Sequence, residues 1–184
     1  MKGVYDMEHV LEMGTTGRHN NIISDILSDI KFKFEKLYKN KQILLFQEQI
    51  ALCYYGEPRD LSSLALIDIA DGFFKPTSMN LYNVVYPDLM LLDASTCFLN
   101  YNETRVAGKP SLVVEVWSDS NSPQHRILKQ TLYSTSDNTE HWYIEQDSDE
   151  VLCMLGKTQL AAQSLKNILI TQNNVEIDLR HLAL

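Results

Sequence analysis

Two acidic residues lie within short apolar segments of the sequence. Asp88 directly precedes residues 89–92, and Glu115 lies inside residues 112–117. A buried carboxylate is costly unless it is hydrogen-bonded, paired or bound to a cation, and two of them on adjacent strands also repel each other. A divalent metal ion would remove both costs. Because Mg²⁺ and Mn²⁺ prefer carboxylate, carbonyl and water oxygens, we identify Asp88, Glu115 and the carbonyl of Val116 as candidate metal ligands.

A simpler alternative is that both acids reach solvent at strand ends, or that each pairs with a basic residue. A predicted helix supplies such a residue, because Ser122 is a typical N-cap and Pro123 suits the first helical position. One face of this helix carries, at i, i+4 and i+8, His125, Lys129 and Tyr133, beside the apolar residues Leu128 and Leu132 that we expect to anchor the helix to the sheet. From that face, the Lys129 ammonium could orient a metal-activated water or stabilise charge on a phosphate.

The spacing of apolar residues predicts the elements that would position these side chains. A first helix is expected from a cap at Thr15 or Thr16 to residues 39–41. Its core face consists of Ile22, Ile23, Ile26, Leu27, Ile30, Phe34 and Leu37. Residues 42–55 predict either one bent strand or two paired strands. Residues 89–92 and 112–117 predict two strands in the middle of a covered sheet.

The rest of the chain predicts shorter elements. The connection formed by residues 94–110 is longer than most structureless loops, so we expect a functional flap or a partly disordered segment. Two hairpins are expected, residues 140–145 with 151–155 and residues 168–171 with 175–177, followed by a short helix over 179–184. The sequence therefore predicts one α/β domain over residues 1–184, with a central mixed sheet flanked by helices.

The charge of the chain bears on its partners. Its 184 residues carry a formal net charge of −8, whereas proteins that bind nucleic acid usually present a basic surface. Positive charge is local, with five lysines between residues 31 and 41 that are most simply a solvated helix face. The cysteines, Cys53, Cys97 and Cys153, are far apart in sequence and are best interpreted as buried apolar residues.

Targeting signals are missing from the pattern. Residues 1–14 lack the basic and apolar regions of a signal peptide, and no apolar run reaches the roughly 18 to 20 residues that a membrane helix needs. We therefore expect a cytoplasmic protein that has no membrane partner.

Several short motifs, in this order, resemble the Uma-two family of restriction-endonuclease-like proteins, which belongs to the PD-(D/E)XK nuclease superfamily. They are Pro87-Asp88, Leu112-Val-Val-Glu115-Val-Trp-Ser118, Lys129 with Tyr133, and Glu140-His-Trp142-Tyr-Ile-Glu145. The resemblance is clearest over residues 84–155. It extends more loosely to His19 in the first helix and to the ending Ile177-Asp-Leu-Arg-His-Leu182. It implies a restriction-endonuclease-like fold.

The resemblance also implies roles for individual residues. Asp88 and Glu115 would be metal ligands, and Lys129 would be the catalytic lysine. The superfamily usually places its lysine two residues after the acid, where this chain has Trp117, and the Uma-two family is similar to this chain in that respect. His125 departs from the family, in which an aspartate is common at this position.

Other residues have simpler interpretations beside a functional one. Glu145 stands where the family usually has aspartate. His19 is most simply a hydrogen-bonding residue at a helix start, and Glu48 an exposed edge carboxylate, although either could contribute to the site. Trp142 and Tyr143 are most simply part of the core.

Three functions are compatible with these patterns. The leading hypothesis is a Mg²⁺- or Mn²⁺-dependent endonuclease that hydrolyses phosphodiester bonds in DNA. The alternative is a catalytically inactive protein of nuclease fold that acts as a binding or regulatory module, which the negative charge, Trp117 and His125 favour. A third is a metal-dependent hydrolase of small nucleotides, whose substrates need no basic surface. A homodimer is left open.

Overall fold

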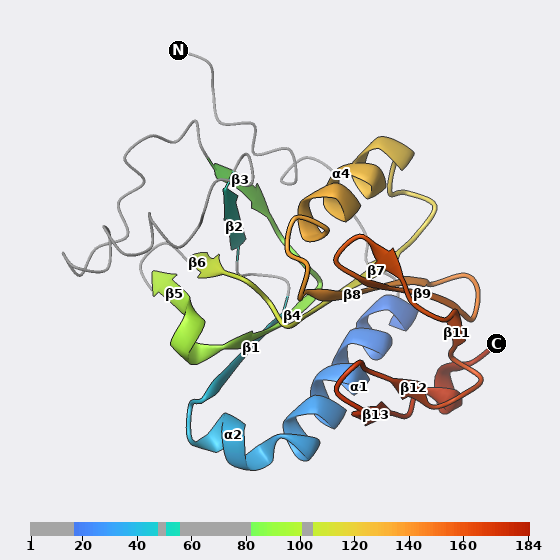
Figure 1. Ribbon diagram of the computed structural model, residues 1–184. Helices are drawn as coiled ribbons and strands as arrows, with labels where there is room; N and C mark the ends of the chain where they lie inside the picture. Colours follow the sequence, from blue (N-terminus) through green and yellow to red (C-terminus); the bar gives the residue numbers. More distant parts are fainter. Residues whose placement is uncertain (1–16, 48–50, 56–81, 101–104) are drawn as a thin grey trace.

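A seven-stranded mixed sheet forms the centre of the protein (Figure 1). The computed structural model describes residues 17–47, 51–55, 82–100 and 105–184. The main strands of the sheet lie in the order β1 (Ile43–Gln47), β4 (Leu89–Asp93), β7 (Leu112–Trp117), β8 (Glu140–Glu145), β9 (Glu150–Leu155) and β10 (Thr158–Gln159), and β11 (Gln163–Ser164) also pairs with β9. Only β7 and β8 run parallel within this sheet as described, and the helix α4 (Pro123–Tyr133) connects them, as a parallel pair requires. The predicted α/β architecture is confirmed.

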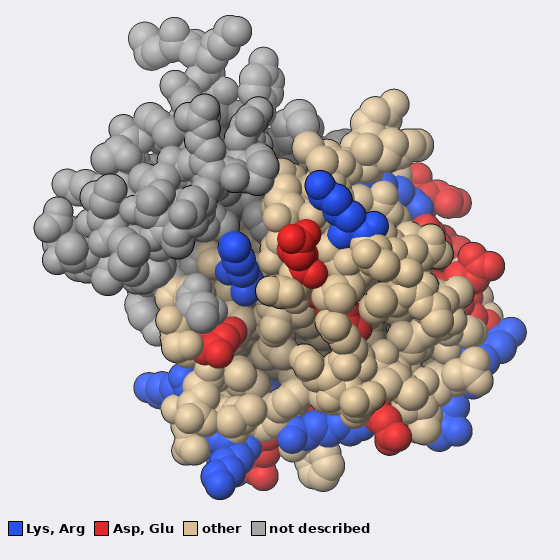
Figure 2. Space-filling view, in the orientation of Figure 1, with Lys and Arg blue, Asp and Glu red and all other residues tan. Residues whose placement is uncertain are grey.

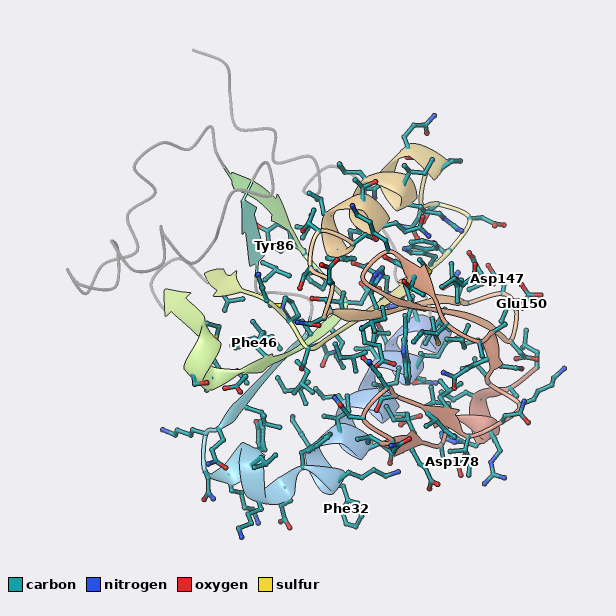
Figure 3. The ribbon with its side chains drawn as sticks, viewed as in Figure 1. Phe32, Phe46, Tyr86, Asp147, Glu150 and Asp178 are labelled. Atoms are coloured by element: carbon teal, nitrogen blue, oxygen red, sulfur yellow. The ribbon has the colours of Figure 1, made fainter. Side chains whose placement is uncertain are left out.

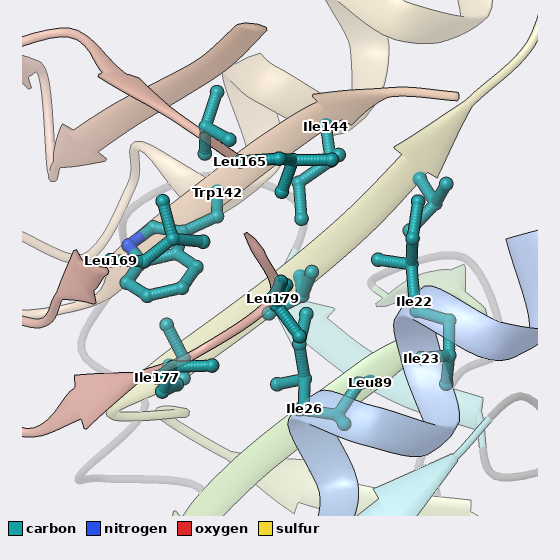
Figure 4. Close-up of a cluster of buried hydrophobic side chains, with 14 of the residues drawn as sticks. Ile22, Ile23, Ile26, Leu89, Trp142, Ile144, Leu165, Leu169, Ile177 and Leu179 are labelled. Atoms are coloured by element: carbon teal, nitrogen blue, oxygen red, sulfur yellow. The ribbon is translucent and has the colours of Figure 1, made fainter. Parts of the chain in front are cut away.

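Two helices cover opposite faces of the central sheet (Figure 1). The long helix α1 (Gly17–Lys33) packs its isoleucines against alternate residues of the strands, and the cluster also includes Trp142 (Figure 4). Helix α4 covers the other face, where the buried residues include Leu132, Tyr133 and Tyr143. Adjacent strand residues such as Trp142 and Tyr143 therefore enter different clusters, as the alternation of a strand dictates.

Two leucines that were predicted to lie on the core faces of the helices are partly exposed. Helix α1 ends at Lys33, and Leu37 lies in a separate five-residue helix, α2 (Glu35–Lys39), where 38% of its surface is exposed. Leu128 was expected to anchor α4, but it is 37% exposed, whereas Lys129 and Tyr133 are buried. The polar face of α4 turns inward because its residues find partners in the sheet.

A second sheet of four strands lies beside the first (Figure 1). Its order is β3 (Tyr82–Val85), β2 (Ala51–Tyr55), β6 (Arg105–Gly108) and β5 (Cys97–Asn100). Residues 94–110 were expected to be a functional flap or a partly disordered segment; in their described part a 3₁₀ turn, η2 (Ala94–Thr96), leads into the antiparallel strands β5 and β6. The idea that residues 42–55 form two paired strands is wrong, since β1 pairs with β4 and β2 pairs with β3 and β6.

The end of the chain forms small elements over α1. Strands β12 (Leu169–Ile170) and β13 (Glu176–Ile177) form the second predicted hairpin, and β8 with β9 forms the first. The expected terminal helix is a short 3₁₀ turn, η3 (Arg180–Leu182). Within the described ranges, the chain has no helix whose length and apolar character would suit a bilayer crossing.

Candidate active site

Asp88 and Glu115 lie where the beginning of β4 meets the end of β7. Asp88 is 8% exposed and Glu115 is 1% exposed. The apolar residues that share their strand faces, including Met90 and Val113, belong to the cluster under α4, as the alternation predicted. Both acids are therefore buried, and the alternative in which they reach solvent at strand ends is wrong.

The carboxylate of Asp88 is held by the backbone of β7 and by the first turn of α1. The amide nitrogen of Val116 donates a 2.6 Å hydrogen bond to Asp88 Oδ2, and Nε2 of His19 lies 3.2 Å from the same oxygen. The pairing of β4 with β7 stops at Leu89 and Val114. Beyond this point the amide of Val116 has the Asp88 carboxylate as its acceptor in place of a strand carbonyl. The carbonyl of Val116 points to the same side of β7 as its amide, towards Asp88.

Glu115 meets two donors from α4, one on each oxygen. The ammonium of Lys129 lies 3.0 Å from Oε2, and the hydroxyl of Tyr133 donates a short hydrogen bond to Oε1. Lys129 Nζ also donates to the carbonyl of Tyr86, at 3.0 Å. Lys129 is 4% exposed and Tyr133 is fully buried. The helix thus delivers a positive charge to the acid, as the sequence predicted for Lys129.

Burial dominates the electrostatics of Glu115. Desolvation raises the pKa of its carboxyl to about 8, and the negative charge of Asp88 adds to the rise. The Lys129 ammonium and the Tyr133 hydroxyl act in the opposite direction, since both favour the ionised form. Glu115 is consequently a carboxyl that gains a proton near neutral pH unless further positive charge reaches it.

Trp117 lies two residues after Glu115, at the end of β7. Its ring is stacked on Tyr143, with centroids 4.4 Å apart, and the guanidinium of Arg126 lies over it at 4.8 Å. Arg126 also forms an ion pair with Glu145, which accounts for that acid without a role in the site. An aromatic stack therefore fills the space after Glu115, and the cation comes from Lys129 instead.

The remaining predicted residues contribute differently. His19, at the start of α1, contacts Asp88. The amide of His125 donates to the Ser122 cap at 3.2 Å, and this contact belongs to the helix start. Glu48 lies outside the described residues. Sequence reasoning placed Tyr133 on the face of Lys129 but gave it no role, and the i+4 spacing between them is the signal that could have found its contact with Glu115.

A second buried acid, Glu140, is the first residue of β8, and its side chain lies on the face of the sheet opposite to that of Glu115. Its carboxylate accepts hydrogen bonds from Trp142 Nε1 at 2.8 Å and from the amide of Gln172 at 2.9 Å. Burial raises its pKa, while both hydrogen bonds lower it. These partners explain Glu140 structurally, which makes it a useful reference for Glu115.

The oxygen donors at Asp88 and Glu115 fit a hard divalent cation. In the described part of the chain, no three His, Cys, Asp or Glu side chains are grouped to hold a metal ion. Two carboxylates and one carbonyl nevertheless suit Mg²⁺, which usually keeps several waters and needs only one or two protein carboxylates. The mutual repulsion of Asp88 and Glu115, visible in the raised pKa of Glu115, is what such a cation would relieve.

Arg18, beside His19, ties this edge of the protein together. Its guanidinium donates to the carbonyls of Gln146, Ser148 and Leu182 and pairs with Asp149 at 3.2 Å. These acceptors belong to the turn between β8 and β9 and to the C-terminal segment. The first turn of α1, and with it His19, is therefore fixed by residues more than a hundred positions away.

Comparison with known proteins supports the fold. No family model and no curated protein matches the chain. A crystal structure from Anabaena variabilis, described as a "putative nuclease belonging to DUF820", matches with a TM-score of 0.59 over 94% of this chain and 85% of that chain. This chain has a nuclease-like fold. The two sequences are 14% identical, so the likeness concerns the fold, and the chemistry has to be argued from the residues of the site.

Proposed function

We propose that the protein is a metal-dependent nuclease of the PD-(D/E)XK type, similar to the Uma-two family, that hydrolyses phosphodiester bonds in DNA. The observation that supports this most directly is the contact between Lys129 Nζ and Glu115 Oε2, at 3.0 Å in a buried setting. A buried ion pair is weak support for stability alone, because two hydrophobic residues would often serve as well. Two acids and a lysine gathered at one strand edge are better explained by chemistry.

Each residue has a role that follows from its contacts. Asp88, Glu115 and the carbonyl of Val116 would hold Mg²⁺ or Mn²⁺, and the metal would supply positive charge to the phosphate and activate a water. His19 keeps Asp88 in place, and the Val116 amide fixes the same carboxylate oxygen.

Lys129 and Tyr133 have distinct roles beside the metal site. Tyr133 orients Glu115 through its other oxygen. The Lys129 ammonium is near enough to Glu115 to stabilise negative charge that develops on a phosphate bound beside that acid.

Cleavage of supercoiled plasmid in Mg²⁺ or Mn²⁺ tests the proposal. Asp88→Asn and Glu115→Gln keep the size of each side chain and remove its negative charge. We expect each to lower the rate of nicking by at least about 100-fold, since each removes a metal ligand. Circular dichroism shows whether each variant is folded, and EDTA should abolish cleavage by the unchanged protein.

Glu140→Gln is the matched control. It makes the same chemical change at a buried glutamate that hydrogen-bonds only structural partners in the described residues. Its nicking rate should stay within a few-fold of that of the unchanged protein. Full activity in the double variant Asp88→Asn with Glu115→Gln would contradict the proposed mechanism.

A second candidate function is a binding module without catalysis. It is favoured by the contacts of Glu115, both of whose oxygens already accept hydrogen bonds from Lys129 and Tyr133. A folded protein that binds DNA and does not cleave it in either metal would support this alternative. Hydrolysis of small nucleotides without plasmid cleavage would support the third function.

A further inference from the structure

The end of α1 and the short helix α2 concentrate positive charge on an acidic protein. Residues 31–42 contain five lysines and one acid, although the whole chain has a formal net charge of −8. We call this surface the lysine tip, which consists of Lys31, Lys33, Lys36, Lys39 and Lys41. Figure 2 shows blue side chains gathered at the lower left, around α2, while red side chains gather towards the right edge.

The lysine tip projects from the fold and contributes little to the core. Helix α2 has no buried residue. Phe32 is 80% exposed, Tyr38 is 39% exposed, and Figure 3 shows Phe32 pointing away from the body of the protein. Basic side chains beside exposed aromatic rings are a pattern suited to nucleic acid, because the charges meet phosphates and the rings can contact sugars and bases.

The partners that these lysines have within the chain neutralise only part of their charge. Lys39 pairs with Glu35, Lys31 lies 5.6 Å from the centroid of the Tyr38 ring, and Lys33 donates to a neutral backbone carbonyl. Across the described ranges of the chain, Lys36 and Lys41 form no ion pair. Exposed pairs of this kind are worth little in water, so they give way readily to a phosphate.

Acids also lie near the lysine tip, among them Glu176, whose backbone carbonyl accepts from Lys33. Asp29 accepts a hydrogen bond from the amide of Asp178 at 3.0 Å, and Asp178 itself pairs with Arg180. Asp93, whose strand neighbour is Ile43, accepts from the amide and hydroxyl of Ser95. Five lysines against one acid over residues 31–42 make the tip locally positive in spite of the overall charge.

Helix α1 links the lysine tip to the candidate active site. It carries His19, which contacts Asp88, near one end and Lys33 at the other. At about 1.5 Å per residue these two positions are roughly 21 Å apart along the helix. A straight DNA duplex that reaches both would have to extend over about six base pairs at 3.4 Å each.

We propose that the lysine tip binds the phosphate backbone of double-stranded DNA, at a distance from the site of chemistry. This goes beyond the proposed nuclease function, because backbone binding at the tip requires neither metal nor cleavage. Lysines and exposed apolar residues could also approach an anionic membrane, but the tip is richer in charge than in apolar surface, which favours phosphates in water over insertion into lipid.

The test measures binding of a fluorescent duplex of about 30 base pairs by anisotropy, in EDTA, at salt concentrations from about 50 to 200 mM. The protein is the full chain carrying Asp88→Asn and Glu115→Gln, so that cleavage plays no part. Into this background we would introduce Lys36→Gln, Lys39→Gln and Lys41→Gln together. Each lost phosphate contact lowers the slope of log affinity against log salt by about 1, so a fall of about 3, with binding at least about tenfold weaker at low salt, is expected.

The matched control makes the same charge change elsewhere, with Lys109→Gln, Lys157→Gln and Lys166→Gln, three exposed lysines outside the tip. It should keep the slope within about 1 of the parent. An equal loss in tip and control variants would overturn the proposal, because net charge alone would explain it. Absence of salt-dependent DNA binding by the parent would also overturn it, as would tip-dependent binding to phosphatidylserine vesicles without DNA binding. Tip-dependent DNA binding, together with no plasmid cleavage by the unchanged protein in Mg²⁺ or Mn²⁺, would contradict only the nuclease function.

Discussion

Glu115→Gln should change how the free energy of unfolding depends on pH. The carboxyl of Glu115 has a pKa of about 8 in the folded protein, whereas an ordinary glutamate has a pKa of 4.5, and burial is the main cause of the difference. Between these two values the folded state holds a proton that the unfolded state has lost. The free energy of unfolding must therefore fall as pH rises from about 4.5 to about 8, and a Gln at this position removes that dependence.

The size of the effect follows from the same shift. Each pKa unit corresponds to about 1.36 kcal/mol, so a rise from 4.5 to about 8 gives at most about 5 kcal/mol. At pH 5 the unchanged protein and Glu115→Gln carry the same charge at this position and should have similar stabilities. At pH 8 and above, the variant should be more stable than the unchanged protein by up to this amount.

Urea unfolding at pH 5, 6.5 and 8.5, followed by tryptophan fluorescence, measures the difference. Titrating groups that do not interact with Glu115 cancel when one free energy is subtracted from the other, which leaves Glu115 together with Asp88 and Lys129, the two charges that act on it. Thr139→Val is the control, since it removes the buried hydrogen bond from Thr139 Oγ1 to the Pro110 carbonyl without removing a titrating group. For Thr139→Val, the difference in free energy of unfolding from the unchanged protein should stay constant with pH. A constant difference for Glu115→Gln as well would refute the raised pKa of the Glu115 carboxyl.

Three further changes test single contacts. Lys129→Met should lower plasmid cleavage by at least about 100-fold while circular dichroism shows an intact fold, because it removes the ammonium that would stabilise negative charge on the phosphate; retained cleavage would remove Lys129 from the mechanism. Ser122→Ala should lower the free energy of unfolding by about 1 kcal/mol in urea, since its hydroxyl caps α4, and no loss would show that the cap is unimportant. Gly156→Ala should destabilise the protein by about 1 to 3 kcal/mol, because Gly156 has φ +52° and a Cβ would lie 2.8 Å from the Cα of Asp137. Gly17→Ala, where a Cβ would meet nothing within 4 Å, should leave the melting temperature nearly unchanged, and equal losses in the two alanine variants would contradict this reasoning.

The acids of the site could be predicted from the sequence because the signal is local. An acid within an apolar strand has to be buried, and the alternation of side chains places Glu115 on the face that α4 covers. The N-cap at Ser122 fixed the start of that helix, so the position of Lys129 followed from its spacing. Sequence patterns can thus predict contacts that depend only on the regular spacing of side chains along a strand or a helix.

The rotation of α4 could not be predicted from apolar periodicity. Leu128 and Leu132 indicated the inward face; Leu132 is buried as predicted, whereas Leu128 is 37% exposed. The contacts of Lys129 and Tyr133 with Glu115 draw the polar face inward instead. Periodicity measures the average preference of a side chain, and a specific buried partner can outweigh it.

The pairing of β2 in the second sheet was missed because its partner strands are distant in sequence. Strand β2 pairs in parallel with β6, which lies more than fifty residues later in the sequence. A parallel pair has no connecting turn from which the pairing could be predicted. The contact of His19 with Asp88 is similarly distant. Nothing in one sequence states which of several compatible partners a strand or a helix end will meet.

The hydrogen bonds of Arg18 limit the order in which parts of this protein can fold during translation. The guanidinium at the start of α1 finds its acceptors at residues 146, 148 and 182, which a ribosome adds long after it has added Arg18. Contacts between such distant residues form slowly, because the intervening chain has to close a large loop. The helix that carries His19 can therefore form early, but the contacts that fix its first turn have to wait until residue 182 has been synthesised. Any activity that needs His19 held beside Asp88 would begin only after that point of translation.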